Sequence, residues 1–143
     1  MIGLGLALAQ PRRRVLVVTG DGEMLMGLGS LATIGVQRPT NLSVVVIDNE
    51  RYGETGMQTT HTAHGVDLAA VARACGFKES RLINAESELA ALRSLIYEKA
   101  GPNFAQVKVV PEKLPLVLPP HDGAALKERF RAAVLSDVLA EKL

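Results

Sequence analysis

The chain has 143 residues, with 16 Lys and Arg against 15 Asp and Glu, so its formal net charge is +1. This balance argues against electrostatic binding of nucleic acid, and no apolar run approaches the ~20 residues of a membrane span. One cysteine excludes an internal disulfide framework and a Cys-x-x-Cys site. The charges at Arg12–Arg14 follow the N-terminal apolar stretch, the reverse of a signal peptide, so we expect a soluble, cytoplasmic protein.

Strand-like and helix-like segments alternate along the chain. The apolar runs are short, β-branched and uninterrupted, as in strands buried on both faces, and helical spacing separates them. Asp67 is the expected N-cap of its helix and Gly76 the C-terminal stop. The alternation predicts an α/β fold, a three-layer, doubly wound parallel sheet with helices on both faces. In chain order the predicted elements are a helix over Ile2–Gln10, a strand over Arg14–Thr19, a helix over Glu23–Gln37, a strand over Leu42–Ile47, a helix over Asp67–Cys75, a strand over Arg81–Asn84, a helix over Glu86–Ala100 and a strand over Phe104–Val110.

The two ends of the chain carry further signals. Prolines between Pro111 and Pro120 predict an extended passage, after which Asp122 is expected to cap a final helix over Ala124–Leu143. The chain opens on a helix, whereas a doubly wound sheet normally begins with a strand. Either the N-terminus is truncated, therefore, or another chain completes this layer. We expect one domain over residues 1–143, short at its N-terminus, with a C-terminal helix over residues 122–143.

The first chemical motif is Gly20-Asp21-Gly22-Glu23, which directly follows the first predicted strand and opens a helix. Ligands of open α/β sheets bind beyond the carboxyl ends of the strands, which is where this turn is expected. The glycines let the backbone approach a ligand closely, and a helix start offers free N–H groups to an anion. The alternative is a plain strand-to-helix turn in which Asp21 only caps the helix.

A second polar pair, Asp48-Asn49, ends the next predicted strand, and Asn49 follows Asp21 by 28 positions. Neighbouring strands lie ~4.8 Å apart, so a strand–helix–strand unit would bring Asp21 and Asn49 to one small ion. Their side-chain oxygens suit Mg²⁺ or Ca²⁺. A bridging divalent cation would also explain why an acidic residue stands in a phosphate-binding turn, because the cation offsets the repulsion between Asp21 and a diphosphate.

A dinucleotide-binding module is the competing interpretation. Gly20-x-Gly22 follows a strand, and the acidic Asp48 comes 26 residues after Gly22. In the fingerprint Gly-x-Gly-x-x-Gly, however, the third glycine would fall at Leu25. An acidic residue between the glycines is also unfavourable for phosphate binding without a metal. The dinucleotide-binding interpretation is therefore the less favoured one.

The two motifs are similar to the signature of the thiamine-diphosphate enzymes, in which Gly-Asp-Gly is followed at this spacing by Asp-Asn or Asn-Asn. Here 25 residues separate the motifs. The similarity extends through GDGEMLMGLGSLATIG, IDNERYGETGMQTTHT and VDLAAVARACGF, from about Gly3 to Phe77, and continues more weakly to Val110. These segments resemble the diphosphate-binding half of the sulfopyruvate and phosphonopyruvate decarboxylase branch. The resemblance implies the thiamine-diphosphate-binding fold.

The resemblance also implies which residues bind the cofactors, thiamine diphosphate and Mg²⁺. Asp21 and Asn49 would bind the metal through their side chains, and Arg51 would bind it through its backbone carbonyl. The amides of Gly22 and Glu23 would hold the diphosphate at the helix start. The full set implied to bind the cofactor is Gly20, Asp21, Gly22, Glu23, Asn49, Arg51, Tyr52 and Gly53.

Two further loop residues are candidates for the active site. Thr55 stands six residues after the metal asparagine, where the pyruvate decarboxylases have a catalytic glutamate, and this departure favours the sulfo/phosphono branch. His61 is either a polar loop residue or a contact to an anionic substrate. His61 and His64 have no second pair of ligands that would make a zinc site, and their roles stay open.

The resemblance implies an enzyme, a thiamine-diphosphate-dependent carboxy-lyase that decarboxylates a small anionic 2-oxo acid such as 3-sulfopyruvate or 3-phosphonopyruvate. In this family the cofactor acts as the electron sink while carbon dioxide leaves. The resemblance also implies a hetero-oligomer with a pyrimidine-binding subunit, which carries the activating glutamate and without which the chain would be inactive. Two alternatives stay open: a subunit of another thiamine-diphosphate-dependent lyase or transferase, and a non-catalytic assembly subunit with a structural metal site.

Overall fold

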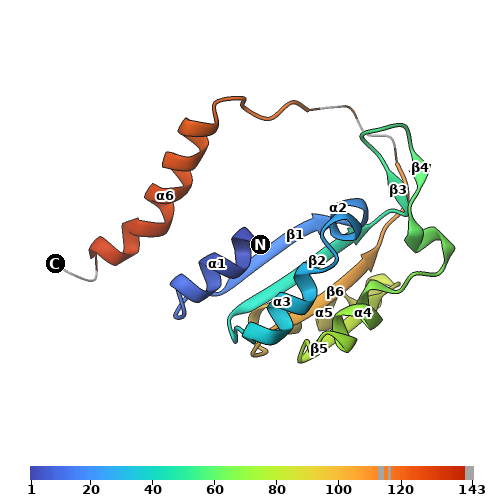
Figure 1. Cartoon of the computed structure of the whole chain (residues 1–143), viewed down its shortest axis with the longest axis horizontal. Helices are drawn as coiled ribbons and strands as arrows, with labels where there is room; N and C mark the ends of the chain where they lie inside the picture. The colour runs from blue at the N-terminus through green and yellow to red at the C-terminus, as the bar shows by residue number, and fades with distance from the viewer. Residues whose placement is uncertain (113–114, 116, 141–143) are drawn as a thin grey trace. The chain divides into compact units, whose positions relative to one another are not determined.

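The structure is a computed structural model that describes residues 1–112, 115 and 117–140 (Figure 1). It divides the chain into two compact units, Met1–Lys113 and Leu114–Leu143. The first unit holds the sheet and both chemical motifs. The second unit contains one helix. The prediction of a single domain over the whole chain stays a prediction.

The first unit is built on a four-stranded parallel sheet, so the predicted parallel α/β fold is confirmed. In the sheet, Gly20 lies opposite Ile47 and Asp48 opposite Lys108, which brings the ends of three strands to one edge. The strand over Leu42–Asp48 contains the unbroken apolar run from Val44 to Ile47, which is typical of an inner strand with helices on both faces of the sheet. In spatial order the strands are β1 (Val15–Gly20), β2 (Leu42–Asp48), β6 (Asn103–Lys108) and β5 (Glu79–Ile83).

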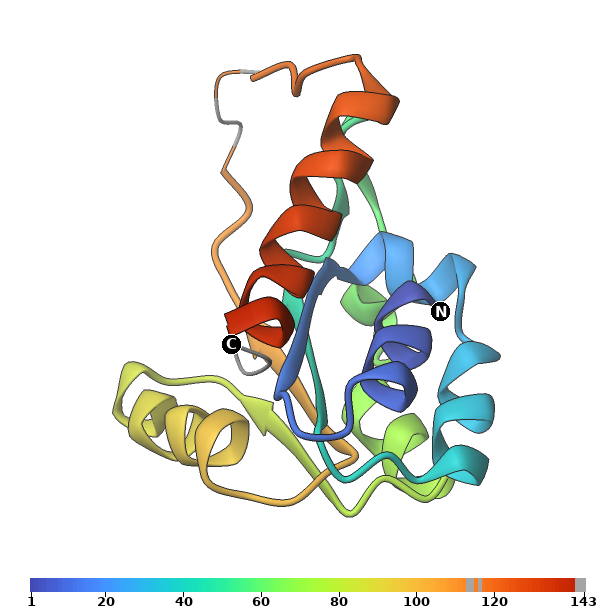
Figure 2. The same ribbon diagram turned by 90° about the vertical axis from the view of Figure 1, so that its left-hand side faces the viewer.

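Helices cover both faces of this sheet, as predicted. One core forms where four helices pack on one face of the sheet, with Leu31, Val46 and Phe104 fully buried at its centre. A smaller core on the other face joins Val45 to Leu95 of a single helix. Figure 2 shows that helix, in yellow, on the opposite side of the sheet from the blue and cyan helices. The four helices are α1 (Ile2–Ala9), α2 (Asp21–Met26), α3 (Ser30–Gln37) and α4 (Leu68–Ala74), and the single helix is α5 (Leu89–Tyr97).

The prediction of one helix over Glu23–Gln37 is wrong. The structure has α2 and α3 there, separated at residues 27–29. Gly27 and Gly29 stand in that interruption, and a glycine costs a helix interior about 1 kcal/mol relative to alanine. Similarly, the predicted helix over Glu86–Ala100 begins as a 3₁₀ turn at Glu86–Glu88 before α5.

Three predicted helix-end residues are confirmed. Asp67 Oδ1 accepts a hydrogen bond from the Ala70 N–H at 2.8 Å, and Gly76 follows α4 with a left-handed φ of +94°. In the second unit, Asp122 Oδ1 accepts from the Ala125 N–H at 2.9 Å at the start of α6 (Gly123–Ala140). The last three residues of the predicted final helix lie outside the described residues.

A short hairpin that the sequence did not predict follows β2. It pairs β3 (Arg51–Tyr52) with β4 (Gln58–Thr59) in antiparallel fashion, and the 3₁₀ turn η1 (His61–His64) comes directly after it. This segment places Thr60 and Thr62 against the carboxyl ends of β1 and β2. Within the described parts of the chain, no helix is long and apolar enough to span a membrane.

Candidate functional site

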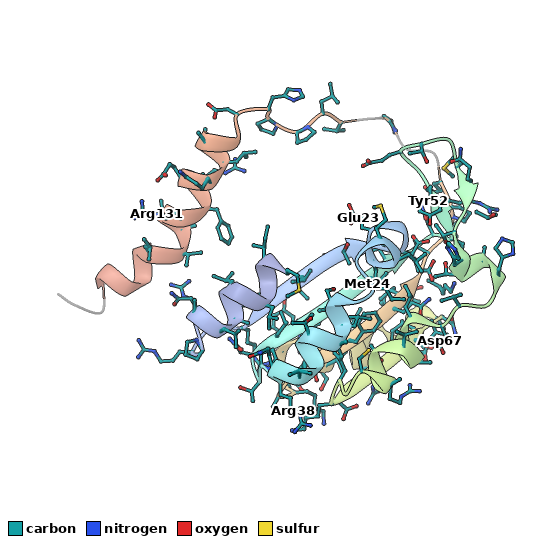
Figure 3. The ribbon with its side chains drawn as sticks, viewed as in Figure 1. Glu23, Met24, Arg38, Tyr52, Asp67 and Arg131 are labelled. Carbon is teal, nitrogen blue, oxygen red and sulfur yellow. The ribbon has the colours of Figure 1, made fainter. Side chains whose placement is uncertain are left out.

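The candidate site lies where β1 and β2 end. Asp21 is the first residue of α2 and directly follows β1, while Asp48 is the last residue of β2 and Asn49 comes next. Figure 3 labels Glu23 and Met24 on α2 and Tyr52 on the neighbouring hairpin. The two motifs therefore meet at neighbouring strand ends, as the sequence predicts.

Glu23, rather than Asp21, caps the start of α2. Glu23 Oε2 accepts hydrogen bonds from the Gly20 N–H at 3.0 Å and from Thr19 Oγ1 at 2.7 Å. The bond from the Gly20 N–H, followed by that from Thr19, lowers the pKa of the Glu23 carboxyl below its usual value. The alternative in which Asp21 serves only as a helix cap is therefore wrong, and Asp21 is available for another role.

Asp21 is a buried carboxylate whose hydrogen-bond donors, among the described residues, are hydroxyl groups. Its side chain is 2% exposed, and Oδ2 accepts from Thr60 Oγ1 at 2.5 Å and from Thr62 Oγ1 at 3.4 Å. Among the described residues, no Lys, Arg or His side chain pairs with it. A buried charge without a counter-charge is unfavourable, so this position favours a bound cation.

Asp48, the second buried carboxylate, is fully compensated. Its Oδ1 accepts from Thr62 Oγ1 at 2.7 Å and from the Glu50 N–H at 3.0 Å. Its Oδ2 accepts from Gln106 Nε2 at 2.5 Å and from Lys108 Nζ at 2.8 Å. Burial by itself raises the pKa of Asp48, but the hydrogen bonds from Lys108, Gln106, Thr62 and the Glu50 N–H outweigh it and hold the pKa below the usual value.

Among the described residues, Lys108 supplies the only cationic side chain that pairs with Asp48. Together with Thr60, Thr62 and Gln106, it links the buried carboxylates Asp21 and Asp48 into one hydrogen-bonded network. Its Nζ lies 2.8 Å from Asp48 Oδ2 and 2.6 Å from Glu50 Oε1. Burial alone lowers the pKa of Lys108, yet hydrogen bonds to Asp48 and Glu50 and their charges raise it overall. The ammonium group of Lys108 is therefore paired with Asp48 and Glu50. Of the two buried carboxylates, Asp21 is the one without a cationic partner among the described residues.

Asn49 and Arg51 lie half-buried in the turn after β2. Asn49 Oδ1 accepts from the Arg51 N–H at 2.9 Å, which holds both predicted ligands in one tight turn. No hydrogen bond links Asn49 to Asp21 in the described chain. The carboxylate that is linked to Asp21 is Asp48, through Thr62. The assignment of Asn49 and the Arg51 carbonyl as metal ligands stays a prediction.

The donor set fits a hard cation that is shared with another ligand. Carboxylate, amide and carbonyl oxygens are the ligands that Mg²⁺ and Ca²⁺ prefer. No cluster of three or more His, Cys, Asp or Glu side chains able to hold a metal occurs among the described residues. A cation at Asp21 would therefore need neutral oxygen ligands and oxygens from a bound molecule such as a diphosphate.

The second glycine of the motif is required by a close contact. A Cβ atom at Gly22 would lie 2.7 Å from Cδ1 of Tyr52, because the tyrosine ring packs against the start of α2. A Cβ at Gly20 would meet nothing nearer than Glu23 Oε2 at 3.9 Å, so the backbone there has room for a ligand. Gly53 is exposed in the hairpin. Contacts of these residues to a cofactor stay predictions.

The active-site candidates lie outside the buried network. Thr55 is exposed and bonds to Gln58 Oε1 at 3.0 Å. His61 is also exposed, and His64 Nε2 lies 3.2 Å from Thr59 Oγ1. No hydrogen bond links Thr55, His61 or His64 to Asp21 in the described chain. Their roles stay predictions.

Four residues of the network were missed from the sequence. Gln106 and Lys108 interrupt an apolar run that was predicted as a buried strand, and a buried polar side chain needs a partner. That pattern could have identified them. Nothing in the local sequence marks Thr60 and Thr62, because their partners lie 39 and 14 residues away. The four are Thr60, Thr62, Gln106 and Lys108.

Comparison with known proteins agrees with this arrangement. Residues 2–107 match the family described as "Thiamine pyrophosphate enzyme, C-terminal TPP binding domain". Sulfopyruvate decarboxylase subunit beta of Methanothermobacter thermautotrophicus is 43% identical over 132 residues, which cover 90% of this chain and 66% of that protein. Phosphonopyruvate decarboxylase of Streptomyces viridochromogenes is 40% identical over 134 residues, covering 93% of this chain and 33% of that protein.

A solved structure supports the fold. The structure of the thiamine diphosphate-dependent 4-hydroxybenzoylformate decarboxylase of Rhodococcus jostii RHA1 superposes with a TM-score of 0.60 at 20% identity, covering 78% of this chain and 23% of that one. The chain spans less than two thirds of the length of the curated relatives described above. The matched region contains both strand-end motifs, so the resemblance on which the site was predicted is confirmed.

Proposed function

The chain belongs to the thiamine pyrophosphate enzymes and contains their C-terminal TPP-binding domain, and we propose that it binds the diphosphate and Mg²⁺ in a 2-oxo-acid decarboxylase. The observation that carries this proposal is Asp21, a buried carboxylate without a cationic partner among the described residues, at the end of β1. A divalent cation would compensate Asp21 and bridge it to a diphosphate. Asn49 and the Arg51 carbonyl would add neutral oxygen ligands.

The residues of the candidate site have separate tasks in this proposal. Thiamine diphosphate, when bound, supplies the electron sink for decarboxylation. Asp21 holds the cation, and the amides of Gly22 and Glu23 face the diphosphate. The capping bonds to Glu23 fix the start of α2, so the backbone there is ordered before a ligand arrives. Tyr52 packs on Gly22 and closes one side of the site.

The proposed substrate is a 2-oxo acid with a second anionic group, 3-sulfopyruvate or 3-phosphonopyruvate. Curated relatives that act on these two classes of acid align with 90% or more of the chain. We expect kcat/KM for such an acid to exceed that for pyruvate by ~10²-fold, because polar groups built for an anion are left unpaired by pyruvate. Steady-state assays of the assembled enzyme with the three acids measure this ratio. Equal kcat/KM values would indicate a general 2-oxo-acid enzyme.

We further propose that the chain works in a hetero-oligomer with a pyrimidine-binding subunit. The relative in Methanothermobacter thermautotrophicus is named as a subunit beta. Strand β1 is an edge strand that pairs with β2 alone among the described strands, and Leu16 and Val18 are 43% and 60% exposed on it. Exposed apolar side chains on an edge strand are typical of a surface that another polypeptide covers.

This assembly predicts that the chain alone does not decarboxylate and that activity appears when the pyrimidine-binding subunit is added. The reason is that the activating glutamate would come from that subunit. The assay compares carbon dioxide release by the chain, by the partner and by their mixture, each with thiamine diphosphate and Mg²⁺. Full turnover by the 143-residue chain alone would contradict the proposal. Binding of cofactor without turnover by the mixture would instead support the non-catalytic assembly subunit.

A further inference from the structure

Two buried threonines connect the ends of β1 and β2. Thr60 is 0% exposed and Thr62 is 5% exposed, and their hydroxyl oxygens lie 2.9 Å apart. Thr60 contacts Asp21 at 2.5 Å, and Thr62 contacts Asp48 at 2.7 Å. The pair therefore joins the uncompensated carboxylate to the compensated one across the strand ends.

The direction of the Thr60 hydrogen bond follows from its chemistry. A threonine hydroxyl has one proton, and an ionised carboxylate can only accept. Thr60 therefore gives its proton to Asp21 Oδ2, and the bond is charge-assisted, which makes it stronger than a bond between neutral groups. The Thr60 bond ends on Oδ2, and Thr62 Oγ1 lies 3.4 Å from the same oxygen, so Oδ1 is the oxygen left for a cation.

Thr60 also holds the turn after β2 through its main chain. The Thr60 N–H donates to the Glu50 carbonyl at 3.0 Å. Glu50 stands between Asn49 and Arg51, the two predicted ligands from that turn, and it has a left-handed φ of +61°. A non-glycine residue in that conformation needs support from its surroundings. Through its hydroxyl and its N–H, Thr60 thus fixes Asp21 relative to the turn at residues 49–51.

We infer that Thr60 is a positioning residue that sets the spacing between Asp21 and the turn at residues 49–51 for a small cation, and so favours Mg²⁺ over Ca²⁺. The inference rests on the proposed function. Mg²⁺ requires near-ideal octahedral geometry with short bonds, whereas Ca²⁺ accepts longer bonds and variable geometry. Loss of the Thr60 hydroxyl therefore lowers the affinity for the smaller ion, Mg²⁺, more than the affinity for Ca²⁺. In this role Thr60 acts on the metal through Asp21, to which its hydroxyl donates.

The test replaces the hydroxyl in Thr60→Val, which has nearly the same shape, and restores it in Thr60→Ser. Mn²⁺ binding to the full chain with its partner and thiamine diphosphate is followed by electron paramagnetic resonance, and Mg²⁺ and Ca²⁺ are titrated as competitors. Partners that orient metal ligands change metal affinity by about 10- to 100-fold when removed. We expect Thr60→Val to lose Mg²⁺ affinity in that range with a much smaller loss for Ca²⁺, and Thr60→Ser to restore the preference.

The matched control is Thr59→Val, in the same segment, whose hydroxyl contacts His64 rather than a carboxylate. It should leave both affinities unchanged. If the valine variant does not fold, Thr60→Cys retains the size with a weaker donor and should show the same loss of selectivity. Unchanged affinities, or equal losses for Mg²⁺ and Ca²⁺, would overturn the positioning role. Failure of the wild-type assembly to bind Mn²⁺ would overturn the proposed function instead.

Discussion

Replacement of Asp21 by alanine is expected to abolish Mg²⁺-dependent binding of thiamine diphosphate while the chain stays folded. Asp21 is the buried carboxylate that lacks a cationic partner among the described residues, so its loss removes the charge that would hold the metal. Removing an outer partner of a metal costs about 10- to 100-fold in affinity, and we expect the loss of a direct ligand to exceed that range. Asp21→Asn keeps an oxygen ligand without the charge and should bind more weakly than wild type but better than Asp21→Ala.

The fold should survive because the hydroxyls around Asp21 keep other partners. Thr60 and Thr62 remain 2.9 Å from each other, and Thr62 still contacts Asp48 at 2.7 Å. Calorimetric titration of thiamine diphosphate, with Mg²⁺ and then with excess chelator, measures the affinity. Asp67→Ala is the control, since it removes a helix cap of about 1 kcal/mol without touching the site. Unchanged affinity in Asp21→Ala would exclude this residue as the metal ligand.

Replacement of Lys108 by methionine is expected to lower the free energy of unfolding by about 3 kcal/mol at neutral pH. The side chain of Asp48 is 0% exposed and that of Lys108 is 25% exposed, so the variant leaves a buried carboxylate without its cation. Such a loss is large because the remaining charge is desolvated, and partial exposure of Lys108 keeps it at the lower end of the usual range. Methionine preserves the length and most of the packing of the lysine stem.

The pH dependence distinguishes this mechanism from lost packing. In the wild type the pKa of Asp48 lies below its usual 3.8, so its interactions contribute stability above that pH and lose it as the pH falls through the lowered pKa. Without Lys108 the pKa of Asp48 rises, and the variant relieves its buried charge at a higher pH. The difference in unfolding free energy should therefore shrink as the pH falls towards 3.8.

Urea denaturation at a series of pH values measures this difference. Arg81→Met, which breaks a pair in which both side chains are substantially exposed, serves as the control and should change stability little at any pH. A loss in Lys108→Met that stays constant with pH would indicate lost packing rather than an uncompensated Asp48.

The sequence by itself determined the parallel α/β fold, the place of the two motifs at neighbouring strand ends, and the family. These features are local or periodic. Runs of β-branched residues, the cap at Asp67 and the spacing from Asp21 to Asn49 can each be read without knowing the rest of the fold. The alternation of strands and helices then leaves few possible topologies, because crossovers between parallel strands are right-handed.

The tertiary structure alone decided which buried carboxylate has a counter-charge. Lys108 reaches Asp48 because β6 pairs with β2 in a register that places these residues side by side. Thr60 reaches Asp21 because the hairpin after β2 folds back over the strand ends, across 39 residues of sequence. Neither contact has a local signal, since each depends on strand order and on the path of a loop. For that physical reason the motif predicts a metal site, but only the packing shows that Asp21 is the buried carboxylate without a cationic partner among the described residues.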